Sequence, residues 1–340
     1  MGDAVSHTFR QMQNGTGLFY GWFEAMHSRF DLLTVGPTEN EAAALCHDIA
    51  AEIRRIENRL NRFDEASDVW QINQNTFYDK CPADPELLGI FADALRYREM
   101  TGGAFDIAIQ TPEYLPGESC FAVDPACEAV VKLRPDAIFD FGGYGKGYAL
   151  QQALGMLKNA GITTALVNFG NSSVCGIGCH PSGDSWQVGV ENPLRRGENM
   201  TFFGLNDLCL SSSGNLPSNR GHIRSPRTGK PVTDNRIVSV AAPSALDSEV
   251  LSTALFVADA AQRQTVLRHF ALVDNDGVVQ VAAFDKSGLQ QRFFLAYEYE
   301  STAGGYFILE LCHVFQCGKL VGDDSRVVGY QHVQAEVLIG

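Results

Sequence analysis

The residues best suited to chemistry lie in the segment 140–150, which reads DFGGYGKGYAL. Four of the six positions from 142 to 147 are glycine, and glycine lets the backbone pass close to a ligand without steric cost. A helix-like run follows from Tyr148, and the start of a helix presents unpaired N–H groups to an anion. Lys146 adds a positive charge and Asp140 a carboxylate. The segment therefore predicts a site for a phosphate-bearing ligand.

Spacing alone leaves other interpretations of this segment open. The glycines match neither GxxxxGK[ST] nor GxGxxG, because Gly147 follows the lysine. The tripeptide DFG also occurs in protein kinases, but the sequence has no HRD loop and no upstream glycine loop of the kinase type. A glycine-rich turn between a strand and a helix, without any ligand, explains the segment equally well.

Two further segments carry groups that could act on a phosphate. Glu249 and Thr253 are four residues apart in the run 247–257, which we expect to be helical, so their side chains share one face. His222 opens a turn-rich segment, 222–232, that holds three cationic side chains. Each feature has a structural alternative, because an acid near a helix start complements the helix dipole and a basic turn is often only solvated.

The composition limits which partners and which cellular compartment we expect for this protein. The chain has 340 residues, of which 45% are hydrophobic and 19% charged, as in a folded protein. Its net charge of −14 argues against nucleic acid and anionic membrane as partners, but not against a local basic site for a small anion. No apolar run approaches the ~18 residues of a membrane span, so no transmembrane segment is expected. Residues 1–7 carry no leader pattern, so we expect a cytoplasmic protein, or a periplasmic or membrane-anchored one if a leader precedes residue 1.

Nine cysteines occur at irregular spacing. The closest pairs are Cys175 with Cys179 and Cys312 with Cys317, and a histidine adjoins each pair, so a zinc site is one interpretation. Buried, reduced thiols are the stronger expectation, and they suit a reducing compartment.

The elements that must position these groups follow from periodicity and capping signals. Apolar residues at helical spacing from Leu45 to Leu60, after a capping box of Thr38 and Glu41, predict a helix over 39–61. Further helices are expected at 85–100 and 148–159, strands at 19–35, 137–139, 163–169, 186–190, 208–211 and 237–241, a polar loop over 64–75 and a hairpin turn at 274–277.

This mixture predicts an α+β fold, with mixed sheets and helices packed outside. We expect residues 1–18 to be a flexible N-terminus and residues 19–288 to form the functional domain. Residues 289–340 alternate apolar and polar side chains, which predicts a β-rich extension of unknown role.

Six segments in sequence order resemble the motifs of the ApbE-like family, the FAD:protein FMN transferases. They read EAMHS at 24–28, RFDEASDVWQIN at 62–73, TGGAFD at 101–106, DFGGYGKGYA at 140–149, SG at 213–214 with HIRSPRTG at 222–229, and SEVLSTALFV at 248–257. The resemblance spans residues 19–285 and implies an ApbE-like (T-fold-like) α+β domain.

The resemblance also implies a reaction and its site. Members of this family move FMN from FAD onto a Ser or Thr hydroxyl of a target protein and release AMP, with Mg²⁺ at the pyrophosphate. The metal ligands would be Glu249, Thr253 and the backbone carbonyl of Gly143, and the catalytic residues would be His222, Glu249 and Thr253. The cofactor-binding residues would be Met26, Phe63, Ala104, Phe105, Asp106, Asp140, Lys146, His222, Ile223 and Arg224. Without the family context, side chains such as Met26 and Phe63 are more often core residues.

The sequence departs from the family pattern around this expected site. Glu249 replaces the usual Asp and is one methylene longer, whereas Asp247 lies off the Thr253 face. Ser172 and Ser225 each stand where the family carries an acid, and Arg224 is an added cation. The alternatives to a transferase are therefore a divergent FAD-binding protein without catalysis and an FAD pyrophosphatase that gives FMN and AMP.

Overall fold

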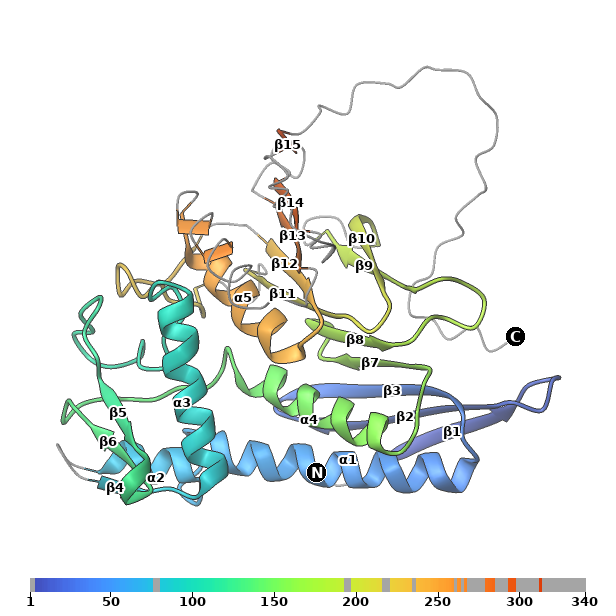
Figure 1. The fold of residues 1–340 in the computed structure, drawn as a ribbon, viewed down its shortest axis with the longest axis horizontal. Coiled ribbons are helices and arrows are strands. Elements are labelled where there is room, and N and C mark those ends of the chain that lie inside the picture. The colour runs from blue at the N-terminus through green and yellow to red at the C-terminus, as the bar shows by residue number, and fades with distance from the viewer. Residues whose placement is uncertain are drawn as a thin grey trace, which may run out of the picture.

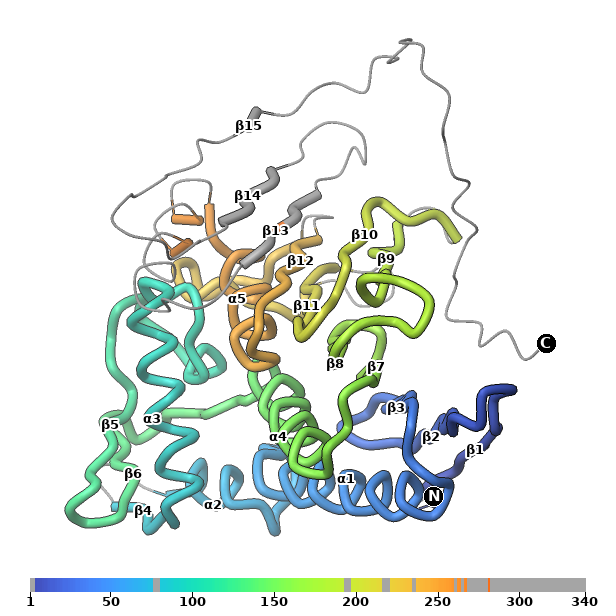
Figure 2. Tube along the Cα trace, turned by 45° about the vertical axis from the view of Figure 1, so that its right-hand side comes forward, coloured from blue at the N-terminus to red at the C-terminus, as the bar shows by residue number. Residues whose placement is uncertain are grey.

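The computed structural model describes residues 4–75, 80–192, 197–215, 221–233, 237–259, 262–263, 266–267, 279–284, 293–297 and 312–313. An antiparallel sheet organises them, with the strand order β1-β2-β3-β7-β8-β11-β12-β13-β14-β15 (Figures 1 and 2). The strands are β1 (Ser6–Gln11), β2 (Gly17–Ala25), β3 (Ser28–Gly36), β7 (Ala165–Phe169), β8 (Ser173–Ile177), β11 (Cys209–Gly214), β12 (Ile237–Ala242), β13 (Val279–Phe284), β14 (Phe293–Tyr297) and β15 (Cys312–His313).

Three helices cover one face of this sheet: α1 (Glu39–Leu60), α4 (Gly145–Asn159) and α5 (Ala245–Val257) (Figure 1). The capping box of Thr38 and Glu41 is formed, which confirms the helix expected at 39–61. The helix α1 turns a stripe of apolar side chains to the sheet, at the three- and four-residue spacing of an amphipathic helix. The stripe comprises Cys46, Ile49, Ile53, Ile56 and Leu60. The expected α+β class with helices outside is confirmed.

The opposite face is partly covered by a hairpin of β9 (Trp186–Glu191) and β10 (Asn199–Leu205). Trp186 and Phe203 of this hairpin pack with Leu210 and Ala241 of the main sheet as a second apolar cluster. The strands β8, β11 and β12 are therefore buried on both faces where the helices and the hairpin overlap.

A smaller unit holds the approach to the glycine-rich segment. It contains α3 (Pro85–Met100) and a sheet of β4 (Lys80–Pro82), β6 (Ala129–Lys132) and β5 (Phe121–Asp124), seen to the left in Figure 1. Phe91 of α3 meets Phe139 and Phe141 edge-on, with ring centroids 5.4 and 5.3 Å apart. Burial of these rings fixes the chain just before the glycines.

The strand expected at 137–139 is not formed. Instead, the side chain of Asn73 bonds both backbone groups of Phe139, accepting from its N–H at 2.8 Å and donating to its carbonyl at 3.0 Å. The side-chain amide of Asn73 thus makes the two hydrogen bonds that a neighbouring strand would otherwise make with Phe139. Asn73 lies in α2 (Asp68–Gln74), which also corrects the loop expected over 64–75, because the Ser67 hydroxyl caps a short helix there.

The expectation of a flexible segment over residues 1–18 is wrong for Ser6–Gln11, which forms β1. Its residues pair with β2 in register, and Phe9 packs against the core, so this strand is anchored by both its ladder and its side chains. Two helix starts also differ, since α4 begins at Gly145 rather than 148 and α5 at Ala245, capped by Ser244. The longer helices place Lys146 and Glu249 inside regular helix.

The two halves of the main sheet meet at a short ladder. The strands β8 and β11 share three register pairs, Cys175 with Cys209, Val174 with Leu210 and Ser173 with Ser211. Cys175 and Cys209 form a disulfide, so the expectation of reduced thiols is wrong for this pair. Cys46, Cys81 and Cys120 are buried free thiols, as expected.

Part of the C-terminal segment lies within the described residues. The strand β14 pairs with β13 and extends the main sheet, whereas the hairpin turn expected at 274–277 lies outside the described residues. The division at residue 288 stays a prediction. Among the described residues, no helix combines the length and apolar character needed to cross a membrane.

An ionic cluster ties three helices together at the end of α1. Arg55 and Arg59 of α1 bond to the Glu86 carboxylate in the first turn of α3, at 2.7 and 2.6 Å. Tyr148 of α4 donates to the same carboxylate at 2.9 Å. The hydrogen bond from Arg55 is the main cause that lowers the pKa of Glu86 to about 2.

We therefore expect Glu86→Gln to lower the free energy of unfolding by roughly 1 kcal/mol at neutral pH, the scale of a partly exposed ion-pair cluster. The folded pKa of Glu86 lies below its unfolded value, so its contribution is complete above about pH 4.5 and is lost as the pH falls toward 2. Urea unfolding of both proteins between pH 7 and 3 measures this. The exposed Glu65→Gln is the control, and a difference that does not change with pH would contradict the prediction.

Candidate functional site

The candidate site centres on the buried carboxylate of Glu249, in the second turn of α5. Ser173 and Ser211, which are register partners on β8 and β11, both donate to its Oε2, at 2.6 and 2.7 Å. Glu249 is 6% exposed, so these bonds replace much of the hydration that an ionised carboxylate would otherwise lose. Both bonds go to Oε2, so Oε1 has no hydrogen-bond partner within the described part of the chain.

The other side of Glu249 meets the glycine-rich segment. A Cβ on Gly147 would lie 2.6 Å from the Glu249 Cβ and 3.1 Å from the Ala245 carbonyl oxygen. The helices α4 and α5 therefore touch at a point where only glycine fits. Gln151, one turn further along α4, accepts the Ala245 N–H at 2.9 Å and fixes the start of α5 against α4.

A chain of hydroxyl groups leads from Glu249 along α5. Ser252 donates to Ser211 at 3.3 Å, and Ser213 lies 2.9 Å from Ser252 and 3.1 Å from the Thr253 hydroxyl. Gly143 faces the same threonine, since a Cβ on this glycine would be 3.4 Å from the Thr253 Oγ1. The structure thus brings Gly143, Glu249 and Thr253 to one place, as expected from the sequence.

Lys146 lies in the first turn of α4 and donates to the Ser172 hydroxyl at 2.5 Å. The Ser172 and Ser173 hydroxyls are 3.5 Å apart, so the ammonium group is close to the bonds that hold Glu249. The partner of Lys146 is a neutral hydroxyl. The positive charge at this helix start is therefore suited to an anionic ligand.

Asp140 is used mainly to shape the loop. It accepts the Gly142 N–H at 2.9 Å and pairs with Arg62 at 3.0 Å. The Arg62 guanidinium stacks on the ring of Phe63, 4.1 Å from its centroid, and this ring is 74% exposed. Phe63 is thus a surface aromatic near the loop rather than a core residue.

The TGGAFD segment contributes one wall and one internal ion pair. Ala104 and Phe105 are buried, and Asp106 accepts from Arg98 and Tyr114, each at 2.7 Å. Asp106 also accepts the Ala108 N–H at 2.8 Å. Its bonds within the protein show that it braces the loop, and a role in contacting the cofactor stays a prediction.

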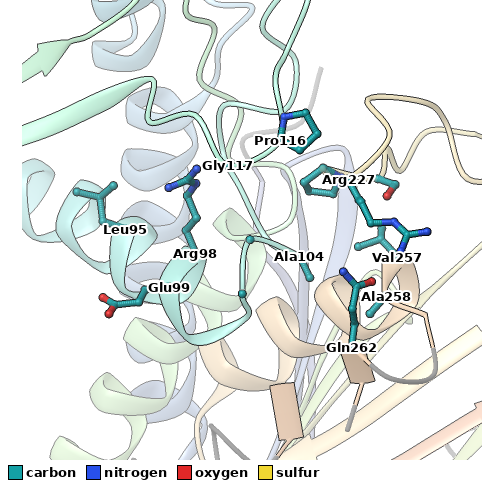
Figure 3. Close-up of a pocket in the computed structure, with 14 residues that line it drawn as sticks. Leu95, Arg98, Glu99, Ala104, Pro116, Gly117, Arg227, Val257, Ala258 and Gln262 are labelled. Carbon is teal, nitrogen blue, oxygen red and sulfur yellow. The ribbon is translucent and has the colours of Figure 1, made fainter. Parts of the chain in front are cut away.

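A cavity of about 510 Å³ opens beside this segment. Figure 3 shows Leu95, Arg98 and Glu99 of α3 on one side, with Arg227, Val257 and Gln262 opposite. Val257 is four residues beyond Thr253 on α5, so the cavity begins one helical turn, or about 6 Å, past the hydroxyl chain. A ligand in this cavity could reach the oxygen-rich region around Glu249.

The loop that begins with His222 contributes residues 225–227 to the cavity lining. His222 is exposed, whereas Ile223 packs against the core and bonds through its carbonyl to the Val232 N–H at 2.8 Å. Arg224 is half-buried and pairs with Pro231 as a backbone bridge, and Ser225 lines the cavity directly. Ser225 therefore lies at the cavity, and Arg224 is its neighbour in the chain.

Met26 lies at the turn between β2 and β3, with φ +48°, and is half-buried against the core. The carbonyl of Arg29 accepts the Gly170 N–H at 2.8 Å, and Gly170 lies against the Ser28 side chain. This places the Met26 turn beside the β7–β8 turn that carries Ser172. Its role toward a cofactor stays a prediction.

Asp247 is directed away from this site. Although it is buried and only two residues before Glu249, it accepts the hydroxyl hydrogen bond of Tyr97 on α3. Burial, together with this carboxylate, raises the pKa of Tyr97 above its usual value, so the phenol stays a donor. Asp247 therefore joins α5 to α3 and is not an alternative ligand.

The donors gathered here fit a hard cation. Within the described residues no cluster of three or more His, Cys, Asp or Glu side chains could hold a metal, so the expected zinc alternative gains no support there. One carboxylate with hydroxyl and carbonyl oxygens is instead the donor type that Mg²⁺ takes when substrate phosphates complete its shell. Glu249, Thr253 and Gly143 supply that set.

Several site residues were missed from the sequence. The serines at positions 173, 211 and 252 gave no motif, because their role depends on register between strands distant in sequence. The serine-rich run at 211–213 was the available signal. Asn73 was noted within a motif, but its pairing with Phe139 could not be foreseen.

Comparisons with known proteins identify a family and a fold. The model of the ApbE family matches residues 26–274. A relative described as an FAD:protein FMN transferase, from Klebsiella pneumoniae (strain 342), is 25% identical over 274 residues, which cover 70% of this chain and 78% of that protein.

Several solved structures resemble the chain, and two of them illustrate the likeness. One is the flavin transferase ApbE from Vibrio cholerae, with a TM-score of 0.66, 17% identity and coverage of 86% of this chain and 97% of that one. The other is the ApbE protein of Thermotoga maritima, with a TM-score of 0.66, 22% identity and coverage of 78% and 94%. At these identities the likeness establishes the fold.

We expect Gly147→Ala to destabilise the protein by about 1–3 kcal/mol, the usual cost of adding atoms where there is no space. The contact with Glu249 outweighs the gain in helix propensity that alanine brings elsewhere. Gly155→Ala in the same helix is the matched control, since a Cβ there meets nothing within 4 Å, and it should stabilise by roughly 0.5–1 kcal/mol. Urea unfolding of both variants decides the matter, and equal stabilities would contradict the close contact.

Proposed function

The chain belongs to the ApbE family, and from this membership we propose that it transfers FMN from FAD to a hydroxyl group of a target protein, with Mg²⁺ as cofactor. The relatives that carry the name FAD:protein FMN transferase support the reaction class. The observation that supports the proposal most directly is that three features lie on one face of α5. Glu249, Thr253 and the cavity wall at Val257 follow one another along it at four-residue intervals.

The proposed binding mode follows from the chemistry of the two regions. FAD has flat ring systems at its ends and a pyrophosphate between them. The cavity of about 510 Å³, with its apolar and cationic side chains, suits a ring system. The start of α4, with Lys146, suits the pyrophosphate, because N–H groups and an ammonium meet there.

Glu249, Thr253 and the Gly143 carbonyl would hold the metal. When bound, Mg²⁺ would neutralise charge that develops on the pyrophosphate. Ser173 and Ser211 keep the Glu249 carboxylate in place through Oε2, which leaves Oε1 for the cation. Lys146 contributes a second positive charge on the side of α4.

The proposed step is one displacement at phosphorus. The acceptor Ser or Thr oxygen forms a bond to the FMN phosphorus, the bond from that phosphorus to the AMP oxygen breaks, and AMP leaves. His222 accepts the proton of the acceptor hydroxyl, a role that its exposure permits, in a loop whose residues 225–227 line the cavity. Positioning by the loop and the helices carries most of the catalysis in such a reaction.

The first test measures AMP release from FAD with Mg²⁺, with and without a Ser/Thr acceptor peptide, together with the flavin mass on the peptide. We expect release that depends on the acceptor and peptide flavinylation. AMP without an acceptor would instead indicate a pyrophosphatase, and FAD binding without any AMP would indicate a non-catalytic flavin-binding protein.

Glu249→Gln should lower the rate of AMP release at least about 100-fold, the scale of losing one electrostatic contact to the transition state. FAD affinity without Mg²⁺, measured by flavin fluorescence, should change less than twofold, because the carboxylate faces the metal and not the rings. Glu65→Gln, an exposed acid, is the control with wild-type rates. A wild-type rate in Glu249→Gln would remove this residue from the site.

His222→Ala should lower transfer by about 100-fold or more, the usual contribution of a general base, with FAD affinity retained. AMP release with the acceptor peptide, measured for the wild type and the variant, tests this. A wild-type rate in the variant would assign proton transfer to another group.

A further inference from the structure

The disulfide of Cys175 and Cys209 lies next to the bonds that hold Glu249. On β8, Cys175 is two residues beyond Ser173, and on β11, Cys209 is two residues before Ser211. Residues two apart on a strand share a face, so the disulfide and the serine pair are adjacent cross-strand pairs on the face that α5 covers. Cys175 and Cys209 are 0% and 3% exposed, within the core under the helices.

The bonds to Glu249 cross a short seam of the sheet. The strands β8 and β11 meet through three register pairs, whereas β3 and β7, and β11 and β12, share five and six. Flanking this ladder are two backbone bonds, from Gly176 N–H to the Leu208 carbonyl at 2.9 Å and from Ser212 N–H to the Ser172 carbonyl at 2.8 Å. A shift of one strand along this seam would separate the two serine hydroxyls.

Glu249 cannot follow such a shift. Gly147 closes the space on the side of α4, and the start of α5 is fixed by Gln151 and by the bond between Asp247 and Tyr97. A movement of β8 relative to β11 would therefore break a bond at Oε2 and leave the carboxylate free to turn.

We propose that the Cys175–Cys209 disulfide is a positioning pair for the transfer reaction, which fixes β8 to β11 so that Ser173 and Ser211 meet on Glu249. The inference rests on the proposed function, since it takes Glu249 as the metal ligand. The disulfide touches neither substrate nor metal, and it acts through the two serines.

Cys175→Ala/Cys209→Ala removes the covalent link, and the readout is Mg²⁺ affinity of the FAD-loaded protein, titrated by flavin fluorescence. The expected result is a Kd about tenfold higher, which corresponds to about 1.4 kcal/mol. FAD affinity without Mg²⁺ should stay within twofold. Cys46→Ala is the matched control, because it also removes a fully buried cysteine from the core but lies on α1, and its Mg²⁺ affinity should equal that of the wild type.

A double-mutant cycle separates positioning from general destabilisation. Ser211→Ala should raise the Kd for Mg²⁺ by itself, and the loss of the disulfide in that background should add less than twofold, because the contact through which it acts is already gone. Additive effects would overturn the proposal, as would an unchanged Kd in the double cysteine variant.

Reduction of the wild-type protein tests the same point without removing atoms. A dithiol reductant breaks the sulfur–sulfur bond, each cysteine sulfur gains one electron and one proton, and the dithiol becomes a cyclic disulfide. Mass spectrometry after alkylation confirms two new thiols, and the Kd should rise as in the double variant. Unchanged affinity after complete reduction contradicts the proposal, whereas a wild-type protein that binds no Mg²⁺ overturns the metal assignment and this inference together.

Discussion

Burial of one ionised carboxylate between a sheet and a helix is the constraint on which the site depends. A carboxylate at 6% exposure is tolerated only with hydrogen-bond donors or a cation beside it. Ser173 and Ser211 provide two donors to one oxygen of Glu249, and the other oxygen is left to the ligand side. The strands must then stay in register and α5 must stay at a fixed distance from them. Gly147 lets α4 pack closely against α5 at this point, because a larger residue would push the two helices apart.

These conditions explain why the proposed site lies at the junction of the two sheet halves. Where a strand pairs along its whole length with both neighbours, its backbone N–H and C=O groups are all bonded within the sheet. Its side chains then pack in the core. At the β8–β11 seam the ladder is short, and small polar side chains occupy the helix-covered face. Helix α5 runs over this seam. The first turn of α4 packs against α5, and no side chain of the described residues caps the start of α4. Hydroxyls, a carboxylate and the start of α4 therefore converge where this ladder is short.

The local parts of this arrangement could be predicted from the sequence. The periodicity of α1 and its capping box, the proline at the start of α3 and the glycine loop before α4 are signals within a few residues. The positions of Glu249 and Thr253 on one helix face followed from their spacing. The disulfide and the serine pair could not be predicted, because 34 residues separate the two cysteines and only strand register brings them together. For the same reason, Asn73 could be recognised as part of a motif but not as the partner of Phe139.

The two acids of α5 show how the fold divides roles between similar groups. Positions two apart on a helix differ by about 200° around the axis, so Asp247 and Glu249 must face different neighbours. Asp247 meets Tyr97, whose raised pKa keeps it a hydrogen-bond donor and makes the pair a fixed link to α3. Glu249 meets two serines across a seam that a disulfide closes. Because the first acid anchors the helix, the second can keep one oxygen for a cation without losing its position.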